Sequence, residues 1–151
     1  MKTSTGHHWL EETGRLGGIL EALLNSTDLG VIGDPYHTWS ALLKEPSKQS
    51  QEFAILDTLF HDTLARALGN TFLLRSLRTI NERLTLFRML DFENPERAEQ
   101  TCRQHLEILN RVMAKDALGA RAAMQDNIET GRNHIRNTIK DALARSYLKK
   151  R

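Results

Sequence analysis

The sequence predicts an all-α protein, folded as an antiparallel bundle of about six helices. Only three prolines occur among its 151 residues, and its many Leu, Ala, Arg and Glu residues favour helices. Apolar residues recur every three to four positions, which is the period of a buried helix face. Short connections between long helical segments place consecutive helices antiparallel. We expect residues 1–151 to form a single domain, since this length suffices for one hydrophobic core.

Three helices are expected in the first half of the chain. The first runs from about Trp9 to Leu24. A short second helix spans about His37 to Lys44, and a long third helix, capped by Ser47 or Ser50, reaches Leu68. Helix-breaking residue types predict a turn before the second helix, at Gly30, Gly33, Asp34 and Pro35.

The second half is expected to hold three more helices. Gly69-Asn70 ends the third helix, and the fourth spans Thr71 to Leu90. Asn94-Pro95-Glu96 starts the fifth, because it supplies an N-cap, a proline in the first turn and an acid at the positive end of the helix dipole. Asp116 caps the sixth, which continues to about Tyr147. The expected buried residues on the fourth and fifth helices are Leu73, Leu77, Ile80, Leu84, Phe87, Ala98, Cys102, Leu106, Leu109 and Val112.

Polar residues interrupt two of these apolar faces. Asp57 and His61, four residues apart, lie on the stripe of the third helix, and His105 lies on the apolar face of the fifth. Buried polar groups without partners are costly. Carboxylate and imidazole groups meeting on two helices are the ligand types of a divalent metal site. The alternative is a hydrogen-bond network that only stabilises the bundle. The apolar stripe around the pair consists of Phe53, Leu56, Phe60, Leu64 and Leu68.

These residues also carry a family resemblance. The run from Leu56 to His61, with Gly69-Asn70 after it, resembles the Asp-x-x-Phe-His … Gly-Asn signature of the FCD domain. That domain is the effector-binding domain of FadR-type, GntR-family transcription regulators. Residues 104–109 resemble its Glu-His-x-x-Ile-Leu motif, and residues 116–128 resemble its Asp-x-x-x-Ala … Met-x-x-His-Ile ending. The resemblance covers roughly residues 53–135.

The resemblance implies a helical bundle with a divalent metal at its centre, most often Zn, with Ni or Mn as alternatives. Asp57, His61 and His105 match the first three metal ligands, and Asn127 stands where metal-binding members have a fourth ligand, His. Three outcomes follow: a three-ligand site completed by water and effector, a site assisted by Asn127, or a metal-free site that binds the effector directly. We favour the first two, because three ligands are intact.

The implied function is sensing of a small organic acid in transcription regulation, without enzymatic turnover. An arginine would clamp the far end of the acid, and the fourth helix offers Arg75, Arg78, Arg83 and Arg88. Such domains pair, so a homodimer is expected. Residues 1–50 diverge from the family and contain no winged helix-turn-helix, so this chain alone is not expected to bind DNA. The lone Cys102 and the absence of a long apolar run predict a cytoplasmic protein without a membrane partner.

Two other readings compete with this one. His61-Asp62 is a His-Asp dipeptide, as in helical HD-type phosphohydrolases, which would also need His37 and either Asp91 or Asp116. Asp62 is expected to face solvent, because it lies one residue past the buried stripe, and this weakens the enzyme reading. The second alternative is a metal-free structural bundle.

Overall fold

The computed structural model describes residues 30–44, 49–67 and 71–148, and every regular element among these residues is a helix. The all-α prediction is confirmed, and the first expected helix, Trp9 to Leu24, lies outside the described residues. Gly69-Asn70 lies outside them too. The elements are α2 (Gly30–Lys44), α3 (Ser50–Ala67), α4 (Thr71–Asp91), α5 (Pro95–Met113) and α6 (Ala117–Leu148).

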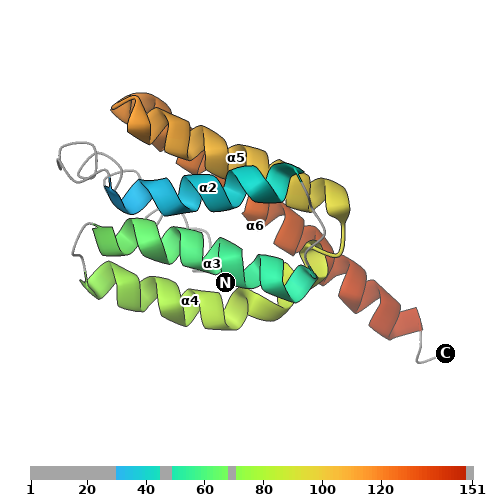
Figure 1. Cartoon of the computed structure of the whole chain (residues 1–151). Helices are drawn as coiled ribbons and strands as arrows, with labels where there is room; N and C mark the ends of the chain where they lie inside the picture. Colours follow the sequence, from blue (N-terminus) through green and yellow to red (C-terminus); the bar gives the residue numbers. More distant parts are fainter. Residues whose placement is uncertain (1–29, 45–48, 68–70, 149–151) are drawn as a thin grey trace.

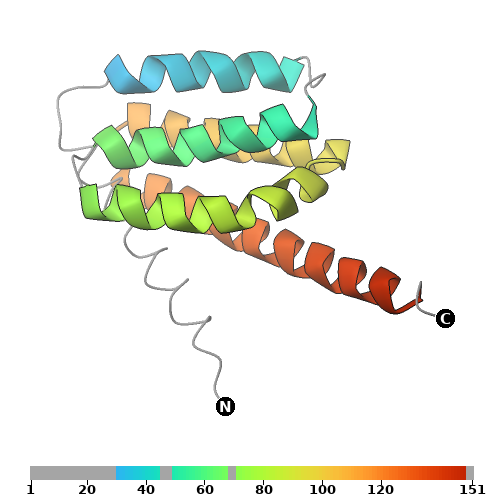
Figure 2. The same ribbon diagram turned by 90° about the horizontal axis from the view of Figure 1, so that it is seen from below.

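The helices close into a ring around one core (Figure 1). Helix α3 packs on α4, α4 on α6, α6 on α5 and α5 on α2, and a lighter contact between α2 and α3 completes the circuit. Figure 2 shows that the C-terminal end of α6 projects beyond the other helices, and residues 141–148 are exposed. Side chains of α3, α4, α5 and α6 that point inward can therefore meet at the centre of the bundle.

The start of α2 differs from the sequence prediction. The expected turn at residues 30–35 is helical, and Pro35 lies inside the helix. Proline lacks the N–H that would bond to the carbonyl of Val31, so the helix loses one hydrogen bond at its second turn. Packing of α2 against α5, in which Trp39 is buried, outweighs this local preference.

Two predicted helix starts are confirmed in atomic detail. Asn94 caps α5, where its side-chain oxygen accepts the backbone N–H of Glu96, and Pro95 occupies the first turn. Asp116 caps α6 by accepting the backbone N–H of Gly119 at 2.9 Å. Between them the chain leaves α5 through Lys115, whose φ of 55° lies in the left-handed region that ends many helices. These caps fix where His105 and Asn127 fall along their helices.

The core is largely the one that the apolar spacing predicts. Burial raises the pKa of the Cys102 thiol to about 11, so this residue acts as a small buried apolar group and not as a thiolate. Ile80, Leu84, Phe87 and Leu106 are only half-buried, contrary to expectation. Ile80 and Leu84 instead line a cavity between α4 and α6. The fully buried core on α5 and α6 consists of Cys102, Ile108, Leu109, Val112, Ala120 and Met124. Among the described helices, none combines the length and hydropathy of a membrane span.

Candidate metal centre

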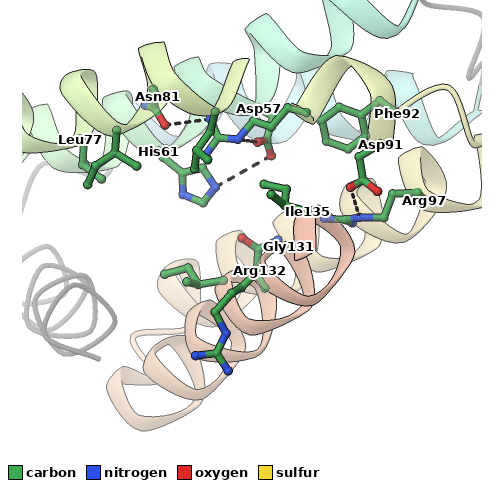
Figure 3. A pocket seen from close by; sticks show the side chains of 15 residues that line it. Asp57, His61, Leu77, Asn81, Asp91, Phe92, Arg97, Gly131, Arg132 and Ile135 are labelled. Carbon is green, nitrogen blue, oxygen red and sulfur yellow. Dashed lines mark hydrogen bonds and ion pairs between the residues drawn. The ribbon is translucent and has the colours of Figure 1, made fainter. Parts of the chain in front are cut away.

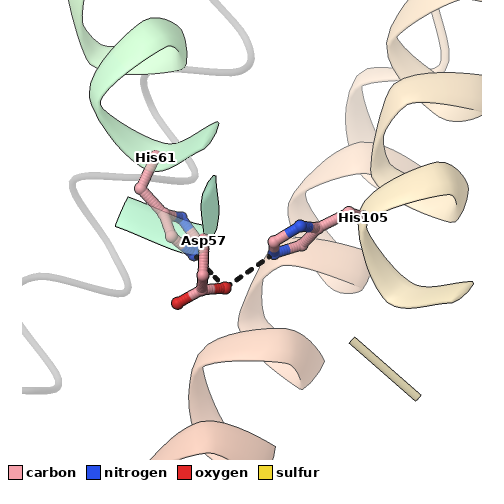
Figure 4. A group of neighbouring side chains, drawn as sticks. All are labelled: Asp57, His61 and His105. Atoms are coloured by element: carbon pink, nitrogen blue, oxygen red, sulfur yellow. Dashed lines mark ion pairs between the residues drawn. The ribbon is translucent and has the colours of Figure 1, made fainter. Parts of the chain in front are cut away.

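Asp57 and His61 of α3 face His105 of α5 across the bundle (Figure 4). All three side chains are buried, and His105 is 0% exposed. The spacing of four residues places Asp57 and His61 on one side of α3. The structure therefore brings together the three residues that the sequence singled out.

The ligand atoms of these residues lie close enough for one ion. His105 Nε2 is 3.2 Å from Asp57 Oδ1, and His61 Nε2 is 3.9 Å from the same oxygen. One ligand atom from each residue lies within 4.8 Å of the others. Ligand atoms around a tetrahedral zinc ion are roughly 3.2–3.6 Å apart. The set is therefore wider than that geometry by at most about 1.6 Å.

Hydrogen bonding satisfies this cluster only in part. The 3.9 Å separation from His61 is too long for a hydrogen bond. His105 Nε2 contacts Asp57 Oδ1 at 3.2 Å without the alignment of a good hydrogen bond, and His105 Nδ1 has no hydrogen-bond partner in the described part of the chain. A buried polar atom without a partner costs about 1–3 kcal/mol. A hydrogen-bond network is thus incomplete here, whereas a cation between the three groups would satisfy them.

Aromatic side chains hold the His105 ring in place. Phe60 stacks on it with ring centroids 3.7 Å apart and an interplanar angle of 10°. Trp39 of α2 meets it edge-on, with centroids 4.2 Å apart. The ring therefore has little freedom to rotate. The Nδ1 atoms of His61 and His105 also lack partners within the described residues, although metal-bound histidines usually donate from the outer nitrogen. A bound metal itself would have to fix the ring tautomers.

The charges of the cluster suit a cation. Burial alone would raise the pKa of the Asp57 carboxyl, but the neighbouring His105 and Arg88 outweigh burial and hold this pKa well below its usual range. Burial lowers the pKa of His61 to about 3 and also lowers that of His105, against the opposing effect of Asp57. An ionised carboxylate and two neutral imidazoles are the protonation states that divalent metals bind.

Arg88 of α4 orients the Asp57 carboxylate. Its Nε lies 3.5 Å from Asp57 Oδ2, while Oδ1 faces the two histidines. Its Nη1 donates to Thr58 Oγ1 at 3.1 Å and to Asn81 Oδ1 at 2.8 Å. One carboxylate oxygen is therefore held by the guanidinium, and the other is presented to the centre of the cluster.

Asn127 of α6 lies beside this cluster, in the wall of the cavity that Asp57 and His61 also line. Its orientation follows from a chain of hydrogen bonds. Gln104 Nε2 donates to Asp126 Oδ2, so Gln104 Oε1 must be the atom that accepts from Asn127 Nδ2, at 3.1 Å. The carbonyl oxygen of Asn127 consequently faces away from Gln104. An amide oxygen is a weaker ligand than imidazole for zinc-like metals.

The cavity has a volume of about 70 Å³ and lies between α4 and α6, next to Asp57 and His61 (Figure 3). Three arginines and two carboxylates line it, which leaves one net positive charge while the histidines are neutral. Arg97 pairs with Asp91 through its Nε at 3.0 Å and also bonds Thr101. The Nε of Arg132 is buried without a hydrogen-bond partner among the described residues. Gly131 also lines this wall, and a Cβ there would make an ordinary contact, 3.6 Å, with Arg97 Nη2.

The sequence profile of the FCD domain matches residues 40–130, which is more than half of the chain. The chain belongs to the FCD domain family. Comparisons with curated proteins and with solved structures gave no match. The resemblance identified from the sequence motifs is confirmed, and membership implies an effector-binding role in regulation.

The four arginines that the sequence offered on α4 of this FCD domain lie in different environments. Arg88 lines the cavity, whereas Arg75 and Arg83 are exposed. Arg78 pairs with Asp62, its Nε 3.6 Å from Asp62 Oδ2. Sequence reasoning missed three residues of the cavity wall, Asn81, Arg97 and Arg132. In the sequence, each of them is a polar residue at or next to an apolar helix face. Many surface residues have the same position, so this signal does not single them out.

The expectation that Asp62 faces solvent is wrong. Asp62 is only 6% exposed, because Arg66 from the next turn of α3 and Arg78 from α4 reach over it. It still does not belong to the cluster of Asp57, His61 and His105 that could hold a metal ion. His37 is exposed on α2, and Asp116 caps α6. The described residues therefore do not assemble the His-Asp arrangement of a phosphohydrolase.

Proposed function

We propose that this FCD domain senses a small organic acid at a bound divalent metal ion, with zinc as the favoured metal. Asp57, His61 and His105 are the proposed ligands, and Asn127 adds its carbonyl oxygen or leaves the fourth position to water and effector. The observation that carries the proposal is His105. Its ring is fully buried, its Nε2 lies 3.2 Å from the ionised Asp57 carboxylate in poor hydrogen-bond alignment, and its Nδ1 has no hydrogen-bond partner in the described structure.

The cavity next to the cluster supports a small anionic ligand. A volume of about 70 Å³ holds roughly five to seven water-sized groups, at about 10–15 Å³ each. This is the size of an acid with two to four carbons. A bound metal would supply open coordination positions for the carboxylate of the acid. Arg132, whose Nε has no hydrogen-bond partner in the described chain, would add positive charge on α6.

The protein's own residues perform the recognition in this proposal. His105 and Arg88 keep Asp57 ionised, and Arg88 holds the carboxylate oxygen that does not face the histidines. The apolar side chains of Leu77, Ile80 and Ile135 along the cavity exclude water, which strengthens electrostatic contacts inside. A ligand that binds one arrangement of α4 and α6 more tightly than another shifts the population toward it. Recognition without turnover is the proposed role, and the domain is proposed to act as a homodimer that relies on other protein segments for DNA binding.

Metal content decides the first part of the proposal. Protein purified without chelator is expected to contain one equivalent of zinc, nickel or manganese by elemental analysis. His61→Gln should lose more zinc affinity in a titration than the roughly 10–100-fold that is lost when a hydrogen-bond partner of a metal ligand is removed. His134→Gln is the matched control, because His134 of α6 contacts Asp91 outside the cluster. Substoichiometric metal in wild type, with zinc titration giving no binding, would leave a metal-free bundle as the better description.

A further inference from the structure

Asn81 is an unexpected buried amide in the wall of the cavity. It lies on α4 between Leu77 and Leu84, is only 5% exposed, and lines the cavity together with Asp57 and His61. The Arg88 guanidinium that reaches Asp57 also meets the Asn81 side chain, which is labelled in Figure 3. A polar side chain so deeply buried needs partners for both ends of its amide.

Arg88 determines which way this amide points. Arginine has donors only, so the atom that meets Arg88 Nη1 at 2.8 Å must be the oxygen of Asn81. The amide nitrogen therefore points elsewhere, and it is buried with no hydrogen-bond partner among the described residues. An unsatisfied donor of this kind costs about 1–3 kcal/mol. A ligand oxygen in the cavity would recover that energy.

The two asparagines of the cavity are thus oriented with opposite polarity. On α6, Gln104 accepts from Asn127 and leaves its oxygen free to face the cavity. On α4, Arg88 donates to Asn81 and leaves its N–H₂ group free. Arg88 also contacts Asp57, so the Asn81 donor is held at a fixed position relative to the proposed metal ligands.

We propose that Asn81 is a specificity-determining residue, whose amide nitrogen donates to a carboxylate oxygen of an acid bound in the cavity. This inference rests on the proposed acid-sensing function and adds a donor on α4 to it. Ligands that present an acceptor oxygen toward α4 are favoured, and ligands that present only donors or apolar groups there are rejected.

The test exchanges the donor for an acceptor. Asn81→Asp keeps an oxygen for Arg88 and nearly the same shape, but it places a negative charge where the amide nitrogen was. Asn110→Asp is the matched control, because Asn110 is exposed on α5. The zinc-loaded proteins are titrated by calorimetry with acetate, glycolate, lactate and malonate, and zinc content is measured in parallel.

We expect the tightest of these acids to bind Asn81→Asp at least about tenfold more weakly than wild type, which corresponds to one lost hydrogen bond to a charged group. Asn110→Asp should bind as wild type does, and all three proteins should retain equal zinc. Equal acid affinity in Asn81→Asp would overturn the inference alone, and would mean that the amide nitrogen meets only water. Failure of every acid to bind zinc-loaded wild type would overturn the acid-sensing function together with it.

A second variant covers the case in which Asn81→Asp does not fold. Asn81→Ser removes the amide donor without adding charge, and its melting curve reports whether the fold is intact. It is expected to lose several-fold in affinity for the same acid while zinc binding is unchanged. Acid binding as tight as in wild type would contradict the inference in this variant as well.

Discussion

Acidification should destabilise the metal-free protein through its buried histidines. Burial lowers the pKa of His61 from 6.5 to about 3 in the folded protein. Below pH 6.5 the unfolded chain therefore takes up a proton that the folded protein does not. The stabilising contribution is fully present above pH 6.5 and is lost progressively as the pH falls toward 3. For His61 alone, the free energy of unfolding should fall by roughly 1.4 kcal/mol between pH 7.5 and 5.5.

The assay is urea unfolding followed by circular dichroism, with chelator present, at these two pH values. The lowered pKa of His105 adds to the loss in the same direction. His61→Gln should show a pH-dependent loss smaller by roughly 1.4 kcal/mol, and substitution of His37, exposed on α2, should leave the loss unchanged. The reasoning is refuted if metal-free wild type is equally stable at both pH values, or if His61→Gln loses as much stability as wild type.

The same burial has a consequence for metal binding. Because burial lowers the pKa of both imidazoles in the folded protein, zinc displaces few protons from them between pH 7.5 and 5.5. Zinc affinity measured by calorimetry on the folded protein should change less than about threefold over this range, whereas an exposed histidine ligand would cost roughly tenfold.

Four further predictions concern single residues. Arg97→Met should lower the free energy of unfolding by about 3–5 kcal/mol in urea, because Asp91 becomes a buried charge without its closest partner. A loss below 1 kcal/mol would show that Asp91 is not held by this pair. Gly131→Ala should raise stability by about 1 kcal/mol, while its Cβ narrows the cavity and weakens acid binding in calorimetry. Asn94→Ala should cost about 1 kcal/mol in thermal unfolding, through loss of the α5 cap. Asn127→His should raise zinc affinity at least about tenfold, because imidazole is the better ligand; unchanged affinity would place position 127 outside the metal's reach.

The sequence alone predicts the parts of this fold that depend on local rules. Asn94 and Asp116 cap their helices because cap chemistry involves only neighbouring residues. The convergence of Asp57, His61 and His105 follows from helical periodicity, since all three lie on apolar faces and apolar faces meet in the core.

Features that depend on neighbours distant in sequence could not be predicted in the same way. Asp62 is buried because Arg78 reaches it from the next helix. Asn81 and Arg97 line the cavity because of how α4, α5 and α6 pack, and nothing local separates them from polar residues on a solvated face. At the start of α2, the preference of glycine and proline for turns pointed to the wrong structure, since packing against α5 overrides it.

The contact between Trp39 and His105 gives the domain a built-in optical reporter. The centroid of the Trp39 ring lies 4.2 Å from that of an imidazole that is proposed to bind the metal. Indole emission is sensitive to charge at such short range, so loading the imidazole should change the intensity or wavelength of Trp39 fluorescence. Trp9 is the other tryptophan of the chain, and in a Trp9→Phe protein the remaining signal would come from Trp39 alone. Metal arrival and departure could then be followed in real time without an added dye.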